Sequence, residues 1–172
     1  MKKIYLLSIL GIFVSNRFYS QSDSTQSILE EFEVTTTRVS EKSPIAHENI
    51  SKEEIEVNNY GVDLPILLDQ ATSIVTTSDA GAGVGYTGIR VRGSDATRVN
   101  VTINGIPFND AEGQGVYWVN MPDISSSTDA IQIQRGVGAS ATGASAFGAS
   151  INLSTLSTVN ANKPYGEISN SF

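Results

Sequence analysis

Residues 98–107 have the sequence Arg-Val-Asn-Val-Thr-Ile-Asn-Gly-Ile-Pro, and the order of their side chains indicates a β-hairpin. Apolar side chains at Val99, Val101 and Ile103 alternate with polar ones, which is the period of a strand with one buried face. Asn104-Gly105 then supplies two residues that tolerate positive φ, as a tight hairpin turn requires. The sequence therefore predicts a strand, a tight turn and a return strand.

The same alternation recurs on both sides of this hairpin. In Ile89-Arg90-Val91-Arg92 the two apolar side chains share one face and the two arginines the other, which predicts a strand that ends before Gly93. Residues 130–136, Ala-Ile-Gln-Ile-Gln-Arg-Gly, repeat the pattern. Further strands are predicted at 74–77 and 150–154.

Two short helices are predicted before these strands. Ser51-Lys52-Glu53-Glu54 has the sequence of a capping box, in which the side chains of the first and last residues bond each other's backbone amides. Asp63, followed by Pro65 in the first turn, is a second helix start with the aspartate as its cap. We expect this second helix to end by about Thr72.

Two long, turn-rich loops, 79–88 and 109–123, separate the predicted strands. Long loops of this kind in a small domain are usually functional or disordered. The aromatic residues of the second loop, Tyr117 and Trp118, either hold the loop against the domain or face a ligand. Together these patterns predict an α+β fold, with a small mixed β-sheet, short helices and long loops.

Composition narrows the range of functions. The chain has 172 residues, 11 Lys and Arg against 18 Asp and Glu, and a formal net charge of −7, which argues against a nucleic-acid binder with a basic face. The absence of Cys excludes disulfides and thiolate metal sites. The single histidine, His47, is interpreted as an exposed loop residue, and the acidic residues form no recognisable catalytic pair. We therefore predict that the chain is not an enzyme and carries no cofactor or metal site.

The first 20 residues have the pattern of a secretory signal peptide. Lys2 and Lys3 precede an apolar run, Ile4–Val14, whose length of about 11 residues is too short to span a bilayer. Ser20 offers a plausible cleavage point, and a short buried segment is the alternative interpretation. Export of a chain without Cys favours a bacterial envelope. Residues 21–40 would follow as a flexible lead.

A glycine motif in the first long loop resembles a dinucleotide-binding fingerprint only in its spacing. Gly83, Gly85 and Gly88 fit G-x-G-x-x-G, but a strand pattern follows them where a nucleotide site needs a helix. We therefore reject a nucleotide site. Arg92 and Arg135 each stand at the end of an alternating strand before a glycine, which suggests a face that meets carboxylates.

In this order the motifs resemble the N-terminal plug domain of TonB-dependent outer-membrane receptors. The similarity covers about residues 30–155 and depends on the ordered set rather than on one motif. The stretches that carry it are Glu31–Arg38, Leu64–Leu68, Ile89–Gly93, Val99–Pro107, Ile131–Gly136 and Phe147–Leu153. The loop over 108–122 is most similar to receptors of Bacteroidetes-type bacteria.

The sequence departs from the family pattern at three places. Asn104 stands where the family usually has Asp, Gln132 where it usually has Glu, and Ala149-Ser150 where Gly-Gly is frequent. The first two departures keep hydrogen-bonding capacity but remove a charge, so they put in doubt any salt bridge that those carboxylates make in relatives.

The resemblance implies a plug that fills the lumen of a roughly 22-stranded barrel in the outer membrane. The periplasmic domain of TonB would add a strand to a box-like segment, and Arg92 and Arg135 would lock the plug to barrel carboxylates. The box-like segment consists of Glu31, Phe32, Glu33, Val34, Thr35 and Thr36. The ligand-facing loop residues would be Thr77, Asp79, Tyr86, Asn109, Asp110, Glu112, Tyr117 and Trp118.

The resemblance also implies a substrate class and a domain division. Ferric siderophores or similar iron complexes are expected because they are frequent in the family, with glycan, cobalamin or haem uptake as alternatives. A stand-alone exported β-rich binding or adhesion module is the alternative outside the family. We expect a plug domain over 41–158, with 159–172 as the start of a linker or first barrel strand, so that the chain would be a receptor fragment without its barrel.

Overall fold

The computed structural model describes residues 38–40, 43–137 and 146–156. Within these ranges a five-stranded sheet has the order β1-β6-β7-β4-β5, and β2 and β3 form a separate hairpin. The strands are β1 His47–Ile50, β2 Ile74–Ser78, β3 Thr87–Val91, β4 Val99–Ile103, β5 Ile106–Pro107, β6 Thr128–Arg135 and β7 Ala149–Thr155. The helices are α2 Lys52–Asn58 and α3 Leu64–Leu67, with the 3-10 turns η2 Leu68–Gln70, η3 Ala96–Arg98, η4 Trp118–Asn120 and η5 Ile124–Ser127.

The five-stranded sheet is mixed. β6 runs antiparallel to both of its neighbours, β1 and β7, whereas β7 and β4 are parallel. β4 turns back into β5 through the predicted tight turn, in which Asn104 and Gly105 have φ of 51° and 80°. The predicted α+β fold with a small mixed sheet and short helices is confirmed.

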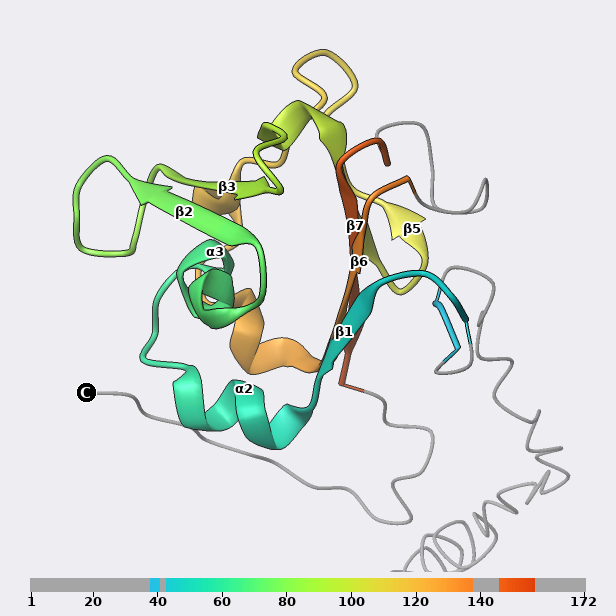
Figure 1. Cartoon of the computed structure of the whole chain (residues 1–172). Coiled ribbons are helices and arrows are strands. Elements are labelled where there is room, and N and C mark those ends of the chain that lie inside the picture. The colour runs from blue at the N-terminus through green and yellow to red at the C-terminus, as the bar shows by residue number, and fades with distance from the viewer. Residues whose placement is uncertain (1–37, 41–42, 138–145, 157–172) are drawn as a thin grey trace, which may run out of the picture. The chain divides into compact units, whose positions relative to one another are not determined.

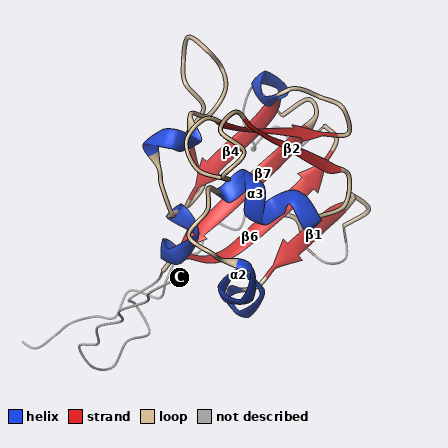
Figure 2. Cartoon of the chain, turned by 90° about the vertical axis from the view of Figure 1, so that its left-hand side faces the viewer, coloured by secondary structure: helices blue, strands red, loops and turns tan. Residues whose placement is uncertain are grey.

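One face of this sheet carries the hydrophobic core. Figure 1 views the sheet edge-on, with α2, α3 and the β2–β3 hairpin all on the same side, and Figure 2 shows these elements in front of the strands. The largest fully buried apolar side chains are Ile55, Leu64, Leu68, Val91, Val99, Val101, Ile131, Ile133, Ile151 and Leu153. The strand alternation and the two helices thus supply one continuous core.

The capping box predicted for the first helix is present. The backbone amide of Glu54 donates to the Ser51 hydroxyl (3.4 Å), and the Ser51 amide donates to the Glu54 carboxylate (2.8 Å). Ile55 then anchors α2 in the core at 1% exposure. Among the described residues, no helix is long and apolar enough to cross a membrane.

The second predicted helix ends before Thr72, as expected: α3 stops at Leu67 and continues as the 3-10 turn Leu68–Gln70. Three other sequence predictions about local structure were wrong. Asp63 stands at the start of α3 but makes no side-chain capping bond, because its carboxylate bonds a distant loop instead. Arg92, with φ of 51°, lies in the turn after β3. His47 belongs to an unpredicted edge strand, β1, and is half-buried there.

Candidate functional site

The loop between β2 and β3 is fixed to the domain by one buried carboxylate. Asp63, 1% exposed, accepts hydrogen bonds from the Gly85 amide (3.1 Å) and the Thr87 hydroxyl (2.9 Å) through the same oxygen, Oδ2. Its own amide donates to the Gly83 carbonyl at 2.8 Å. Through its carboxylate and its backbone amide, Asp63 therefore holds this loop against the start of α3.

Glycines let the loop approach that helix closely. Gly83 has φ of +75°, and a Cβ placed on it would lie 3.2 Å from the Val62 side chain. Gly85 also has positive φ, and a strand follows the motif rather than a helix. The glycines therefore serve the turn and the close contact, which agrees with rejecting a nucleotide site.

The loop after β5 is also fixed by one side chain. The amide group of Asn109 accepts from the Val101 amide (2.8 Å) and donates to the carbonyls of Val99 and Gln114 (both 2.9 Å). Asn109 thereby takes the place of a strand residue beside β4. This explains how a loop with little regular structure keeps a defined position next to the sheet.

Asp110 organises the tip of the same loop. Its carboxylate accepts from the amides of Glu112 (3.0 Å) and Gly113, and its carbonyl accepts from the Gln114 amide (2.9 Å). Asp110 thus bonds within the loop, whereas Asn109 bonds both the loop and β4. Glu112 and the Tyr117 side chain remain exposed.

The predicted ligand-facing residues fall into two groups that the structure does not bring together. Thr77, Asp79 and Tyr86 belong to the β2–β3 hairpin, and Tyr86 is 70% exposed. Tyr117, 54% exposed, belongs to the other loop, and Figure 1 shows the two loops projecting from different corners of the domain. Each loop therefore presents one exposed tyrosine on its own.

Trp118 lies in the core at 2% exposure. Of the two roles open to the loop aromatics, its position fits the one that holds the loop against the domain. The neighbouring Tyr117 points outward enough to be reached from solvent. One residue of the pair therefore anchors the loop and the other is available for contact.

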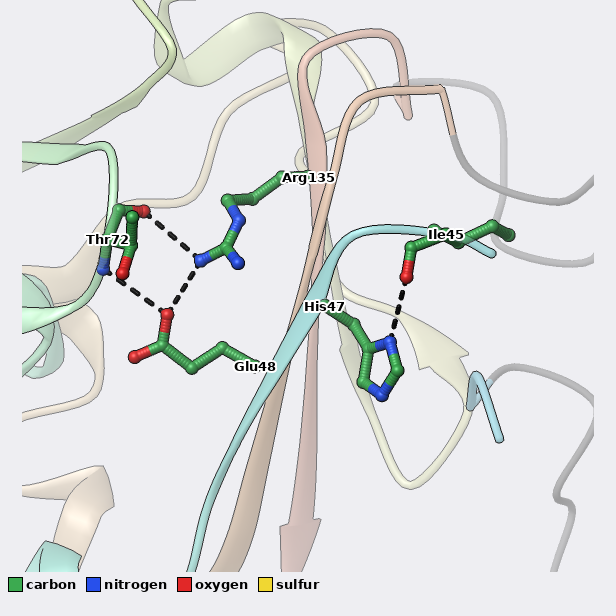
Figure 3. Close-up of polar contacts among 5 residues, drawn as sticks. All are labelled: Ile45, His47, Glu48, Thr72 and Arg135. Carbon is green, nitrogen blue, oxygen red and sulfur yellow. Dashed lines mark hydrogen bonds and ion pairs between the residues drawn. The ribbon is translucent and has the colours of Figure 1, made fainter. Parts of the chain in front are cut away.

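The two arginines predicted to lock the plug are neighbours in space. Arg135 forms an ion pair with Glu48 of β1 (2.6 Å, Nη1 to Oε2), and both side chains reach Thr72, whose amide donates to Glu48 (Figure 3). Arg92 Nη1 lies 3.5 Å from the Arg135 carbonyl. Arg135 thus has a carboxylate partner inside the domain, and pairing of either arginine with a barrel stays a prediction.

His47 is held locally rather than as part of a cluster. Its Nδ1 lies 2.8 Å from the Ile45 carbonyl, as Figure 3 shows. Within the described ranges, no group of three or more His, Cys, Asp or Glu side chains is arranged to hold a metal ion.

Two exposed carboxylates have pKa values shifted by local hydrogen bonds. The Thr97 hydroxyl, donating at 2.5 Å, holds the pKa of Asp95 below its ordinary value, and Arg98 and Arg90 act in the same direction. Backbone hydrogen bonding in the first turn of α2 lowers the pKa of Glu53, with the Ser51 side chain adding to it. Both groups are fully exposed, so these shifts mark local turn structure rather than a reactive site.

The second face of the five-stranded sheet is polar, and sequence analysis did not predict that it is buried. Two rows of polar residues cross four strands in register: Asn49, Gln132, Asn152 and Thr102 in one, and His47, Gln134, Ser150 and Asn100 in the other. The six members on β4, β6 and β7 are at most 3% exposed. Alternation alone indicated a solvent-facing side here, so burial could not be foreseen from the strand pattern.

Hydrogen bonds run along these rows and between them. The Thr102 hydroxyl donates to Asn152 Oδ1 (2.5 Å), Gln132 Nε2 to Asn49 Oδ1 (2.7 Å) and Gln134 Nε2 to Gln132 Oε1 (3.1 Å). Gln132 also bonds both backbone groups of Val39, at 2.7 Å and 3.0 Å. The departure from the family pattern at position 132 was the one sequence signal that pointed to this network.

The predicted box-like segment, 31–36, and the predicted signal peptide lie outside the described residues.

Comparison with known proteins identifies the fold. The family model described as TonB-dependent Receptor Plug Domain matches residues 39–150. A search of curated proteins found no match. Among solved structures, the siderophore receptor PirA from Acinetobacter baumannii is similar with a TM-score of 0.51 and 19% identity over 64% of this chain. FpvA of P. aeruginosa, solved with heterologous pyoverdines, is similar with a TM-score of 0.53 and 17% identity over 67% of this chain.

The matched receptors are much longer than this chain, which covers 17% of PirA and 14% of FpvA. At these identities the structural similarity shows the fold. The family model spans most of the chain, and its range includes both loops, Arg92, Arg135 and every member of the polar rows except Asn152. The chain belongs to the family of TonB-dependent receptor plug domains.

Proposed function

We propose that this chain is the gating and substrate-binding plug of an outer-membrane receptor that takes up ferric siderophores or similar iron complexes. The family match over 39–150 supports the plug assignment. Two of the similar structures, the siderophore receptor PirA and FpvA bound to heterologous pyoverdines, favour the substrate class. Residues 159–172 would form the start of the linker or first strand of the barrel.

In this proposal the two fixed loops carry the ligand contacts. Asp63 and Asn109 give each loop a preferred shape before any ligand arrives, which lowers the entropy lost on binding. The exposed tyrosines, Tyr86 and Tyr117, then offer aromatic and hydroxyl groups to a chelate. Thr77, Asp79 and Glu112 provide further exposed polar groups.

Energy would come from TonB acting on the segment Glu31–Thr36. In this proposal TonB binds the segment by strand addition. Arg92 and Arg135 would contact carboxylates of the barrel wall. Arg135 would then either leave Glu48 for the barrel carboxylate or contact both carboxylates at once. Exported location in the outer membrane follows from this assignment.

Retention on the immobilised periplasmic domain of TonB tests the box assignment. The full chain should be retained, and Val34→Pro should not be, because proline removes a donor that strand addition needs. Thr25→Pro, the same change in the preceding lead, is the control and should be retained. Equal retention of both proline variants would contradict the assignment.

Ligand binding can be followed by fluorescence of the only tryptophan, Trp118, which adjoins Tyr117. Titration with ferric siderophores should quench it in a saturable way, and Tyr117→Ala should weaken the apparent affinity. Tyr60→Ala, which removes a tyrosine of 69% exposure that belongs to neither loop in the sequence, should leave the affinity unchanged. Saturable quenching by haem, cobalamin or a glycan alone would replace the proposed substrate class.

A further inference from the structure

The side-chain amide of Gln132 binds the backbone of Val39 as a neighbouring strand would. Its Oε1 accepts from the Val39 amide at 2.7 Å, and its Nε2 donates to the Val39 carbonyl at 3.0 Å. Both backbone hydrogen-bonding groups of one residue are therefore satisfied by one side chain, 93 residues away in sequence.

All four hydrogen bonds available to this amide are used. Besides the two to Val39, Nε2 donates to Asn49 Oδ1 at 2.7 Å, and Oε1 accepts from Gln134 Nε2 at 3.1 Å. A primary amide offers two donors, and the carbonyl oxygen accepts two bonds, so the group is matched to its surroundings. Gln132 is 3% exposed, which leaves little water to replace any of these partners.

An ionised glutamate could not make this set of contacts. An ionised carboxylate only accepts hydrogen bonds, so the Val39 carbonyl and Asn49 Oδ1 would both face an anion. The usual family residue at this position is thus incompatible with the observed hold on Val39. The amide of Gln132 is what makes the contact possible in this chain.

Val39 lies between the box-like segment and the sheet, so its contact with Gln132 connects the two. Val39 lies three residues beyond Thr36, the last residue of the box-like segment. Gln132 lies in β6, which is paired on both sides by β1 and β7. A pull on the N-terminal segment would therefore reach the interior of the sheet at this residue.

We propose that Gln132 is a positioning residue whose amide clamps Val39 to β6, holding the chain that follows the box-like segment on the sheet until the clamp opens. The clamp stands on the hydrogen bonds alone, whereas its link to TonB rests on the proposed function. Opening it would free the chain upstream of residue 40 for a partner strand.

A spin label at Ser40→Cys measures the clamp directly. The chain has no Cys, so the label occupies one site, and Ser40 is exposed beside Val39. In the otherwise unchanged full chain the label should be mostly restricted. Because a net hydrogen bond shifts such an equilibrium roughly fivefold, Gln132→Met should raise the ratio of mobile to restricted label about 25-fold by removing two.

Two further variants separate the clamp from a general loss of folding. Gln132→Glu should give a mobile fraction that rises with pH, because the buried carboxyl, with a pKa raised above its ordinary range, can donate a bond only when protonated. Val39→Pro removes the donor to Oε1 without changing β6 and should raise the ratio roughly fivefold. Gln114→Glu, the same change on an exposed loop, should leave the label restricted at every pH.

Fluorescence of buried Trp118 reports whether each variant keeps the folded core. If a change at Gln132 unfolds the sheet, Val39→Pro still tests the clamp, because it leaves β6 unchanged. Restricted label in Val39→Pro and in every folded Gln132 variant, with no pH dependence in Gln132→Glu, would overturn the clamp. The same variants are then tested for retention on TonB. Stronger retention with a mobile label supports the link, whereas a mobile label without retention by any variant overturns the proposed function and leaves the clamp standing.

Discussion

On the three strands β4, β6 and β7 both faces of the sheet are buried, but the two faces are held by different forces. On one face, Ile133, Ile151 and Val101 meet in register beneath α2, α3 and the β2–β3 hairpin. On the other, Asn152 and Thr102 meet in the next register position and share a hydrogen bond. The same strands therefore form one layer held by apolar packing, which has no preferred geometry, and one layer held by hydrogen bonds, which depend on direction.

This difference determines how each face tolerates change. Apolar contacts depend on filled volume, so shape can be exchanged for similar shape at modest cost. In a buried hydrogen-bonded network, every polar group that is left without a partner costs the free energy of its desolvation. We expect the apolar face to set the stability of the domain and the polar face to set which segments can lie on it.

The largest expected effect is on the apolar face. Ile151→Ala should lower the free energy of unfolding by about 2–5 kcal/mol, because Ile151 is fully buried at the centre of the sheet. Urea denaturation followed by Trp118 fluorescence measures this. Ile106→Ala, at 71% exposure, should change stability by less than about 0.5 kcal/mol. Equal effects of the two would break the contrast between core and edge.

A smaller effect is expected on the polar face. Thr102→Val keeps the side-chain shape but removes the donor to Asn152, and should cost about 1–3 kcal/mol of unfolding free energy. The double variant Thr102→Val with Asn152→Leu should cost less than the sum of the single changes, since both partners are then removed. Additive losses in urea denaturation would show that the row is not a coupled network.

The ion pair on the apolar side of β6 should contribute less again. Arg135→Met keeps the aliphatic stem but removes the partner of Glu48, and should cost about 1–2 kcal/mol, since both side chains are partly exposed. A double-mutant cycle with Glu48→Gln measures the coupling. Loss of stability without coupling would mean that Arg135 acts through packing and leaves its guanidinium available for another carboxylate.

The smallest effect is expected outside both layers, at Asp95. The folded-state pKa of Asp95 lies below its ordinary value of 3.8, chiefly because of the Thr97 hydroxyl. Its contribution to stability is therefore full above that value and is lost as pH falls through the folded pKa. The free energy of unfolding of Asp95→Asn should differ from that of the parent chain by less and less as the pH falls below 4, as measured by urea denaturation. A difference that grows on acidification would contradict this sign.

Local patterns in the sequence predicted most of the fold. The alternation at 99–103, the turn at Asn104-Gly105 and the capping box at Ser51 were confirmed, because each depends on residues close together in the chain. The edge strand β1 was missed because His47–Ile50 is short and pairs with residues more than 80 positions away. The role of Asp63 was wrong for the same reason, since its partners lie in a distant loop.

The candidate site was predicted more in location than in detail. Both loops were identified from their composition, and Tyr86 and Tyr117 are exposed in them. Nothing in the local pattern distinguished Tyr117 from the buried Trp118, because their separation is made by the fold around η4. Asn109 and Asp110 likewise serve loop structure through bonds that spacing alone did not reveal.

By itself the sequence determined the fold class, the strand alternation and the family, because these follow from local periodicity and from the order of motifs. Only the tertiary structure decided that the polar face of the sheet is buried and that Gln132 holds Val39. Burial and hydrogen-bond partners depend on which distant segments meet, and alternation along one strand carries no information about what covers its second face.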